Sequence, residues 1–384
     1  MKPQTRWVIV LTAALVLSAS AGQKSANTLA EIYAGGSVRF IPELTIDETT
    51  LPKEVFFESA VDIRCDPGGN VFVCDFRAHN VKKFDSSGKF LKTIGREGQG
   101  PGEFSWPFAL AVTADRLFVY DMRNNRVCAL SPEGEFIKSV PVLTGEGRPR
   151  KMNSLPNGDL VVGMVKTDFR EMEKPQNYSV EIYSPDLEHK RTIFTQEVME
   201  NKYMRLEQGL ANIPQPFSPF VHWDVLKDGR IVIAYAKNYE IFVFDAEKGK
   251  IGSFSRAYEP VKVTKKDEEQ FFAGMSYTAD GGTVRQGAPD HIVKNTEFPK
   301  HKPPFFNLLA DPEGNILVFT HRSNKEEEWK YFEAFTPEGK YLGGVQVTGK
   351  DTLFQLASVG SGAFWGRAVN EEGVSRVVKY RISD

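Results

Sequence analysis

The sequence predicts an all-β fold built from six four-stranded units, and two repeated signals lead to this prediction. Each unit has a tight turn before an apolar strand, as in DPGGNVFV from residue 66 and LKDGRIVI from residue 226. Most units also have a strand that ends in an aromatic residue or Leu before a polar turn, as in FDSSGKF from residue 84 and FTPEGKY from residue 335. Gly and Asn supply the positive φ that short hairpins require. Four-stranded units in series are typical of a β-propeller.

The last unit lacks a strand, which predicts how the ring closes. The chain ends after the third strand of the sixth unit, residues 376–382, whereas residues 38–47 alternate like a strand with no hairpin partner nearby. Adding this N-terminal strand completes the last blade and removes exposed sheet edges. We therefore expect an all-β, six-bladed β-propeller with four-stranded antiparallel blades, closed by the N-terminal strand.

Residues 57–141 carry a more specific pattern. A Gly-rich connector, GREGQGPGEF from residue 95, precedes the second unit, and the second strands of the first two units end in Val-x-Asp at Asp75 and Asp121. A turn with Asn or His follows each Asp. These features resemble the NHL-repeat class of six-bladed β-propellers, of the exported bacterial type. The resemblance implies ligand or protein binding for most members and a metal-dependent lyase for a few.

Residues 1–21 have the pattern of a secretory signal peptide. Lys2 and Arg6 precede an apolar run over residues 7–17, and Ala-Ser-Ala at 19–21 fits a cleavage site. The run is shorter than the roughly 20 residues that span a bilayer. We therefore expect export to a periplasm or the outside, with no transmembrane segment after cleavage. Residues 22–37 are expected to be a polar tether, and residues 38–384 the propeller.

Cysteine count and charge restrict the partners. The sequence contains three cysteines, Cys65, Cys74 and Cys128. An odd number leaves at least one thiol free, and we expect buried free thiols. The formal net charge is −2 at pH 7, which favours no nucleic-acid partner. The expected partners are an anionic small molecule, glycan or peptide, or another protein, bound by a monomer.

Two long insertions predict an elaborated face. The turn-to-turn spacing is 71 residues between the third and fourth units and 85 between the fourth and fifth, against 42 between the second and third. The surplus lies at 194–220 and 255–305, with smaller surpluses at 166–177 and 322–330. Thr264 to Asp267 resembles a capping box that opens a short helix, and the rest is expected to be loop. All four links emerge on one face of a propeller, where we expect binding.

A basic residue recurs near the end of the second strand of each unit. The residues are Arg77, Arg123, Lys166, Lys237, Arg322 and, two places earlier, Arg367. Arg and Lys side chains on the elaborated face would attract a carboxylate, phosphate or acidic sugar, and the planar guanidinium suits such groups best. Alternatively, these residues are solvated strand ends or partners of Asp75 and Asp121.

The innermost strands provide an alternative site. Asp62, His222 and Asn307 occupy equivalent places there and would serve a metal-dependent lyase or hydrolase, with calcium or zinc at the central channel. No other cofactor is predicted. Only one of the six histidines lies on an innermost strand, and no nucleophile motif or P-loop is present. The sequence therefore favours a non-catalytic binding protein, with the enzyme as the alternative. A third hypothesis is a protein-interaction platform that uses Phe217, Phe220, Phe271 and Phe272.

Overall fold

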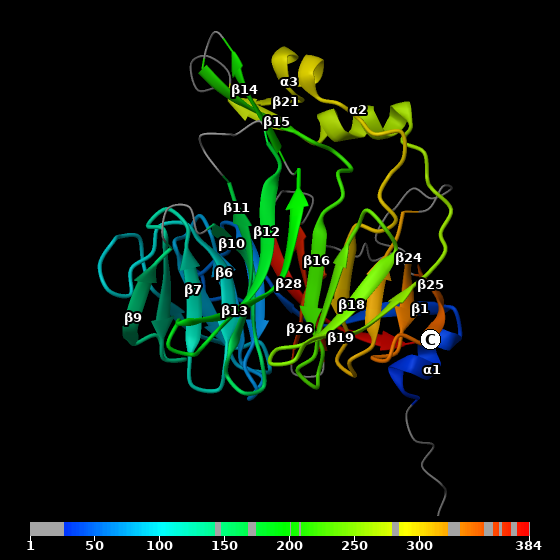
Figure 1. The fold of residues 1–384 in the computed structure, drawn as a ribbon. Coiled ribbons are helices and arrows are strands. Elements are labelled where there is room, and N and C mark those ends of the chain that lie inside the picture. The colour runs from blue at the N-terminus through cyan, green and yellow to red at the C-terminus, as the bar shows by residue number, and fades with distance from the viewer. Residues whose placement is uncertain are drawn as a thin grey trace, which may run out of the picture.

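The computed structural model describes residues 27–142, 147–167, 174–199, 201–206, 209–278, 284–321, 331–348, 356–360, 363–369 and 375–383. Strands make up six antiparallel blades that surround a common axis, so the predicted six-bladed β-propeller is confirmed (Figure 1). The predicted signal peptide, residues 1–21, lies outside the described residues. No helix among the described residues is long and apolar enough to cross a membrane.

The blades follow the chain, and each begins with its innermost strand. Blade 1 contains β2 (Ala60–Cys65), β3 (Val71–Asp75), β4 (Asn80–Phe84) and β5 (Phe90–Ile94). Blade 2 contains β6 (Pro107–Val112), β7 (Leu117–Asp121), β8 (Arg126–Leu130) and β9 (Phe136–Pro141). Blade 3 contains β10 (Arg148–Ser154), β11 (Leu160–Lys166), β12 (Gln176–Tyr183) and β13 (His189–Val198).

The remaining blades have the same order. Blade 4 contains β16 (Val221–Val225), β17 (Ile231–Tyr235), β18 (Glu240–Asp245) and β19 (Gly249–Ser255). Blade 5 contains β22 (Asn307–Ala310), β23 (Ile316–Phe319), β24 (Tyr331–Phe335) and β25 (Tyr341–Thr348). Blade 6 contains β26 (Leu356–Gly360), β27 (Ala363–Val369), β28 (Ser375–Ser383) and the N-terminal β1 (Ser37–Ile46). Buried apolar side chains of neighbouring blades pack face to face, so the core lies between blades.

The N-terminal strand closes the ring as predicted. β1 pairs antiparallel with β28, from Arg39 opposite Ser383 to Ile46 opposite Val377. A second pairing was not predicted: residues Ser37 to Arg39 pair parallel with β25 of blade 5. Blades 5 and 6 therefore share one eight-stranded sheet, and β1 is hydrogen-bonded on both sides.

The predicted tether at 22–37 contains a packed helix, which corrects that prediction. Helix α1 (Leu29–Ala34) begins at Thr28, whose side chain forms a capping box with Glu31. Tyr33 is fully buried and packs edge-on against Phe332 of blade 5, with 5.5 Å between ring centroids. The short helix is thus held against the propeller by Tyr33, with Leu29 and Ile32 packed against the same apolar cluster.

The two insertions lie on the same face of the propeller, as predicted (Figure 1, top). The first forms a hairpin of β14 (Asn201–Leu206) and β15 (Gly209–Pro214). The second contains α2 (Lys265–Ala273), β20 (Ser276–Thr278), β21 (Val284–Gln286) and α3 (Asp290–Asn295). The capping box at Thr264 is confirmed, but the loop predicted for the remainder is wrong. We call these elements the cap.

The repeated aspartates are structural. Asp75 is buried and accepts hydrogen bonds from the backbone N–H groups of Glu58 and Ser59, at 3.0 and 2.7 Å. Asp121 accepts one from Ser105 at 2.7 Å. These contacts fix the chain just before the innermost strand of the same blade. Their cationic partners are Lys82, at 2.7 Å, and Arg126, at 3.1 Å. The pairing of Arg77 and Arg123 with these aspartates, one of the alternatives above, is not what the structure shows.

The three cysteines carry free thiols, as predicted. Cys74 and Cys128 are buried, whereas Cys65 is half-buried. Burial raises the pKa of Cys128 to about 11, so this thiol stays protonated at neutral pH.

Candidate functional site

The innermost strands align as the sequence predicts. Asp62, Lys151, His222 and Asn307 lie opposite Cys74, Gly163, Ala234 and Phe319, which are the fourth residues of their second strands. These side chains therefore occupy equivalent places around the central channel.

Asp62 and Arg64 cross-link three blades inside the channel. Asp62 accepts hydrogen bonds from the N–H groups of Ile63 and Leu110, at 2.9 and 2.8 Å. Its carboxylate lies 3.3 Å from the guanidinium of Arg64, which donates to the carbonyl of Met152 in blade 3 at 2.9 Å. Burial raises the pKa of Asp62, and the charge of Arg64 opposes that rise. Asp62 is thus engaged in holding blades 1 to 3 together.

Lys151 and Asp224 continue this network into blades 4 and 5. The Lys151 ammonium donates to the carbonyl of Trp223 at 2.6 Å and lies 3.3 Å from Asp224. Asp224 also accepts the N–H of Ala310 in blade 5, at 3.0 Å. Burial lowers the pKa of Lys151, and the charge of Asp224 opposes this effect. The polar residues of the channel therefore bond to one another and to neighbouring backbones.

In the part of the chain that the structure describes, no hydrogen bond or ion pair joins the three residues of the predicted channel site, Asp62, His222 and Asn307. Burial, and then the charge of Lys151, lower the pKa of His222 to about 3, and its ring packs between Phe220 and Phe305. The Asn307 side chain accepts the N–H of Leu308, its neighbour in the chain. Within the described ranges, no group of three or more His, Cys, Asp or Glu side chains is placed to hold a metal ion.

The predicted basic residues fall into two groups. Arg77, Arg123 and Lys237 are exposed, just beyond the ends of β3, β7 and β17. By contrast, Lys166 pairs with Glu181 at 2.7 Å, and Arg367 donates to the carbonyl of Ala60 at 2.9 Å. Burial lowers the pKa of Arg367. Arg322 lies outside the described residues. Of the predicted basic residues that the structure describes, Arg77, Arg123 and Lys237 are thus the ones exposed for a ligand on this face.

Blades 1 and 2 carry an aromatic surface that the sequence patterns did not predict. The rings of Phe76 and Trp106 stack with centroids 5.8 Å apart and planes 26° apart, and Phe108 meets Phe76 edge-on at 6.4 Å. The guanidinium of Arg123 lies 5.0 Å from the Trp106 ring, and that of Arg150 lies 5.9 Å from Phe108. We call these five residues the platform.

The backbone holds Trp106 in an unusual conformation. Its φ is +64°, which costs a bulky residue about 1–3 kcal/mol. The N–H of Trp106 donates to Nδ1 of His79 at 3.1 Å, and its carbonyl accepts the N–H of Met122 at 3.1 Å. The residue remains 38% exposed. The Trp inside the Gly/Pro connector was the sequence signal that could have indicated this surface. Its positive φ, however, cannot be predicted from the sequence.

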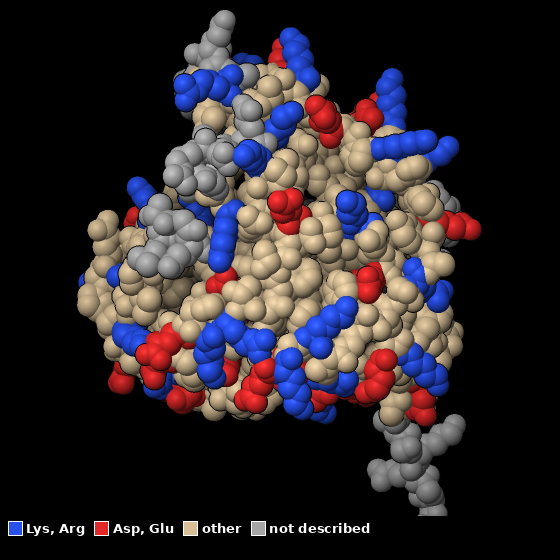
Figure 2. Space-filling view, in the orientation of Figure 1, with Lys and Arg blue, Asp and Glu red and all other residues tan. Residues whose placement is uncertain are grey.

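The cap has an aromatic core of its own. Phe298 packs against Phe271 and Phe272, each at 5.6 Å between centroids, and against Phe217 at 6.4 Å. Lys302 pairs with Asp267 of α2 at 2.6 Å. Three phenylalanines of the third hypothesis, Phe217, Phe271 and Phe272, thus join the two insertions through Phe298. The fourth, Phe220, packs instead against Tyr178 of blade 3. In Figure 2, cationic and anionic side chains also mix along the rim opposite the cap, so neither sign dominates there.

The comparisons with known proteins agree on the fold. A family model described as a 6-bladed beta-propeller (DUF5128) matches residues 38–144. The chain is therefore a protein of the six-bladed β-propeller class. A search of curated proteins finds no match.

Three solved structures illustrate the likeness. A protein of inferred export from Bacteroides fragilis is 11% identical, with 91% of this chain and 95% of that chain covered and a TM-score of 0.50. A DUF4221 member from Bacteroides vulgatus is 12% identical, with 91% and 99% covered and a TM-score of 0.51. Virginiamycin B lyase from Staphylococcus aureus is 10% identical, with 90% and 100% covered and a TM-score of 0.43. At such low identities, the first two likenesses show the fold alone.

Proposed function

We propose that this protein is an exported, non-catalytic binding protein whose platform captures an acidic sugar. The observation that carries the proposal is Trp106, which the fold holds half-exposed at a positive φ between Phe76 and Arg123. Strained residues that the surrounding structure maintains are concentrated at binding sites. The resemblance of residues 1–21 to a signal peptide supports export.

The platform combines two kinds of contact. Phe76, Trp106 and Phe108 offer flat apolar surface for the ring faces of a sugar. Arg123 and Arg150 lie against these rings, and their guanidinium groups suit a ligand carboxylate. Arg77 follows Phe76 in the chain and is exposed, so it extends the same cationic surface.

The binding test compares two ligands that differ only in charge. Oligogalacturonic acid carries a carboxylate on each ring, and its methyl ester keeps the rings without the charge. We expect calorimetry to show at least tenfold tighter binding of the acid, weakening as salt is added. Equal affinity for the two ligands, or no binding of either, would refute the proposal.

Variants locate the binding surface. Trp106→Gly removes the ring while Gly accepts the positive φ, so binding is expected to disappear with less than about 1 kcal/mol change in unfolding free energy. Arg123→Glu is expected to reduce affinity at least tenfold. Lys89→Glu makes the same charge change at an exposed turn between the third and fourth strands of blade 1 and serves as the matched control. Equal effects of Arg123→Glu and Lys89→Glu would show that only net charge matters.

A further inference from the structure

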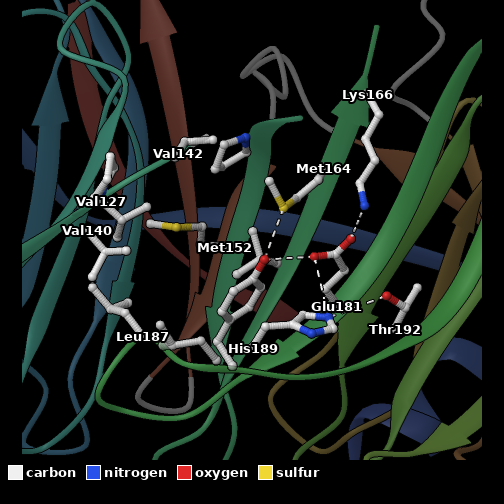
Figure 3. Close-up of a pocket in the computed structure, with 15 residues that line it drawn as sticks. Val127, Val140, Val142, Met152, Met164, Lys166, Glu181, Leu187, His189 and Thr192 are labelled. Atoms are coloured by element: carbon white, nitrogen blue, oxygen red, sulfur yellow. Dashed lines mark hydrogen bonds and ion pairs between the residues drawn. The ribbon is translucent and has the colours of Figure 1, made fainter. Parts of the chain in front are cut away.

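A pocket of about 450 Å³ lies between blades 2 and 3, and none of the five platform residues is among those that line it (Figure 3). Its lining includes exposed residues of the outermost strands, Pro141 of β9 and His189 and Thr192 of β13. The pocket therefore opens at the outer edge of the propeller. Its volume falls within the range of about 300–1,000 Å³ that is typical of small-molecule sites.

The walls of the pocket are apolar. Blade 2 contributes three valines and blade 3 a group of aliphatic and thioether side chains, which close around the space in Figure 3. These residues are Val127, Val140, Val142, Met152, Leu160, Val162, Met164 and Leu187. Methionines adapt their shape to different ligands, so Met152 and Met164 suit a pocket that must fit an apolar body.

One corner of the pocket holds a buried carboxylate. Glu181 of β12 is only 3% exposed. One of its oxygens, Oε1, lies 2.7 Å from both the Lys166 ammonium and the Ser179 hydroxyl, and Oε2 accepts from the Tyr183 hydroxyl at 2.7 Å. Burial alone would raise the pKa of Glu181, but these hydrogen bonds outweigh it and lower the pKa. The carboxylate is therefore ionised at neutral pH.

The Oε2 atom keeps room for one more donor. A carboxylate offers about four acceptor positions, and three are taken by Lys166, Ser179 and Tyr183. The next group, Nε2 of His189, lies 3.8 Å from Oε2, beyond hydrogen-bond distance. Among the residues that the structure describes, nothing else is recorded on this oxygen. A ligand group at this position must donate a hydrogen bond.

The charges in the pocket also restrict the net charge of the ligand. Lys166 already neutralises Glu181 at 2.7 Å. A cationic ligand would add an uncompensated charge beside apolar walls, and an anionic ligand would be repelled by the Glu181 carboxylate, so both are disfavoured. A hydroxyl donates without bringing charge. We propose that the pocket binds a small neutral amphiphile, with its apolar body between blades 2 and 3 and its hydroxyl donating to Oε2 of Glu181.

The first test uses three probes of one shape. 2-Naphthol is a neutral bicyclic alcohol at pH 7, naphthalene lacks the hydroxyl, and 2-naphthoate carries a negative charge. We expect 2-naphthol fluorescence to report saturable binding at least tenfold tighter than that of naphthalene or 2-naphthoate. Equal affinity for 2-naphthol and naphthalene, or no saturable binding of 2-naphthol, would overturn the proposal.

Two variants are designed to block the pocket. Val140→Phe fills the space from β9, and Thr192→Trp covers the mouth from an exposed position that folding tolerates. Ile251→Phe adds the same ring at an exposed site of β19 and is the matched control. We expect at least tenfold weaker 2-naphthol binding in the first two variants and wild-type binding in the control. Wild-type affinity in Thr192→Trp would overturn the proposal.

A double variant tests the polar corner. Lys166→Met with Glu181→Met keeps the approximate shape while removing both charges and the acceptor oxygens, so no buried charge is left unpaired. We expect the preference for 2-naphthol over naphthalene to fall at least fivefold, with naphthalene affinity unchanged. A preserved preference would show that Glu181 is not the acceptor. Because the platform is untouched, oligogalacturonate binding is expected to stay normal, which separates this site from the proposed function.

Discussion

Two interfaces between blades carry the same carboxylate and differ in whether they are open. Glu181 of blade 3 and Glu333 of blade 5 occupy the same place in their third strands, opposite Val162 and Val318. Each accepts a tyrosine hydroxyl and pairs with a cation. For Glu181 these are Tyr183 and Lys166 of its own blade, each at 2.7 Å. For Glu333 the two partners belong to the preceding blade.

The interface between blades 4 and 5 is joined across its gap. Tyr239 of blade 4 donates to Glu333 at 2.5 Å, and Arg256 lies 3.1 Å from the same carboxylate. The Arg256 guanidinium also lies 3.6 Å from the ring centroid of Tyr341 in blade 5. The places of Tyr239 and Arg256 are held in blade 2 by Asn125 and Val142, since each pair makes the same backbone hydrogen bond. Neither Asn125 nor Val142 is recorded as bonding to Glu181.

The difference indicates that the blade supplying the hydrogen-bond donors determines whether the carboxylate bonds across the interface or lies beside a pocket. A carboxylate satisfied across the interface ties two blades together. A carboxylate satisfied within its own blade leaves the interface free to open, and the 450 Å³ pocket lies there. The same strand position can therefore support stability at one interface and binding at another.

The largest expected effect is the loss of unfolding free energy when Glu333 is replaced, compared with the same replacement of Glu181. Glu333→Ala leaves the buried Tyr239 hydroxyl without its acceptor and Arg256 without its counter-charge, which we expect to cost about 3 kcal/mol of unfolding free energy. Glu181→Ala is expected to cost about 1 kcal/mol, because water in the pocket can replace the lost acceptor. Urea denaturation of both variants measures this. Equal losses would break the comparison.

A substitution that imitates the closed interface is expected to affect binding more than stability. Val142→Arg places in blade 2 the cation that Arg256 provides in blade 4. We expect the long Arg side chain to occupy the pocket, reducing 2-naphthol affinity at least tenfold, which is about 1.4 kcal/mol. Fluorescence titration measures it, with Ile251→Phe as the control. Unchanged affinity would mean that the Arg256 position does not determine closure.

The sequence predicts the repeated part of this molecule well. Turn residues and strand ends recur within each blade, so the six blades and the closing strand β1 follow from local patterns. The capping box that begins α2 at Thr264 is also a local pattern. The parallel pairing of β1 with β25 involves only residues Ser37 to Arg39, which is too short for a pattern. Helix α1 is likewise only six residues long and buries one side chain fully, Tyr33, which is too little for a pattern.

The sites were harder to predict because they depend on contacts between blades. The sequence identified Lys166 and Arg123 as cations but not their partners, Glu181 and Trp106. Glu181 stands in the strand NYSVEIY, where a carboxylate among buried residues was the available signal. Whether an interface opens depends on residues of another blade, such as Val142, and no local pattern contains that information.

The smallest expected effect is a difference in alkaline stability. Burial, followed by the charge and hydrogen bond of Glu333, raises the pKa of Tyr239 far above its usual 10. A pKa raised on folding gives stability that is complete below the unfolded pKa and is lost as pH rises above it. In Tyr239→Phe the hydrogen bond is absent, so the variant is expected to be about 1 kcal/mol less stable at pH 8.

That gap should shrink by about 1 kcal/mol between pH 9 and 11, because only the wild-type unfolded chain gains an ionised tyrosine at this position. Urea denaturation of both proteins across this pH range measures the gap. A constant gap would mean that Tyr239 ionises in the folded protein, and so that the interface between blades 4 and 5 is open to solvent like its counterpart between blades 2 and 3.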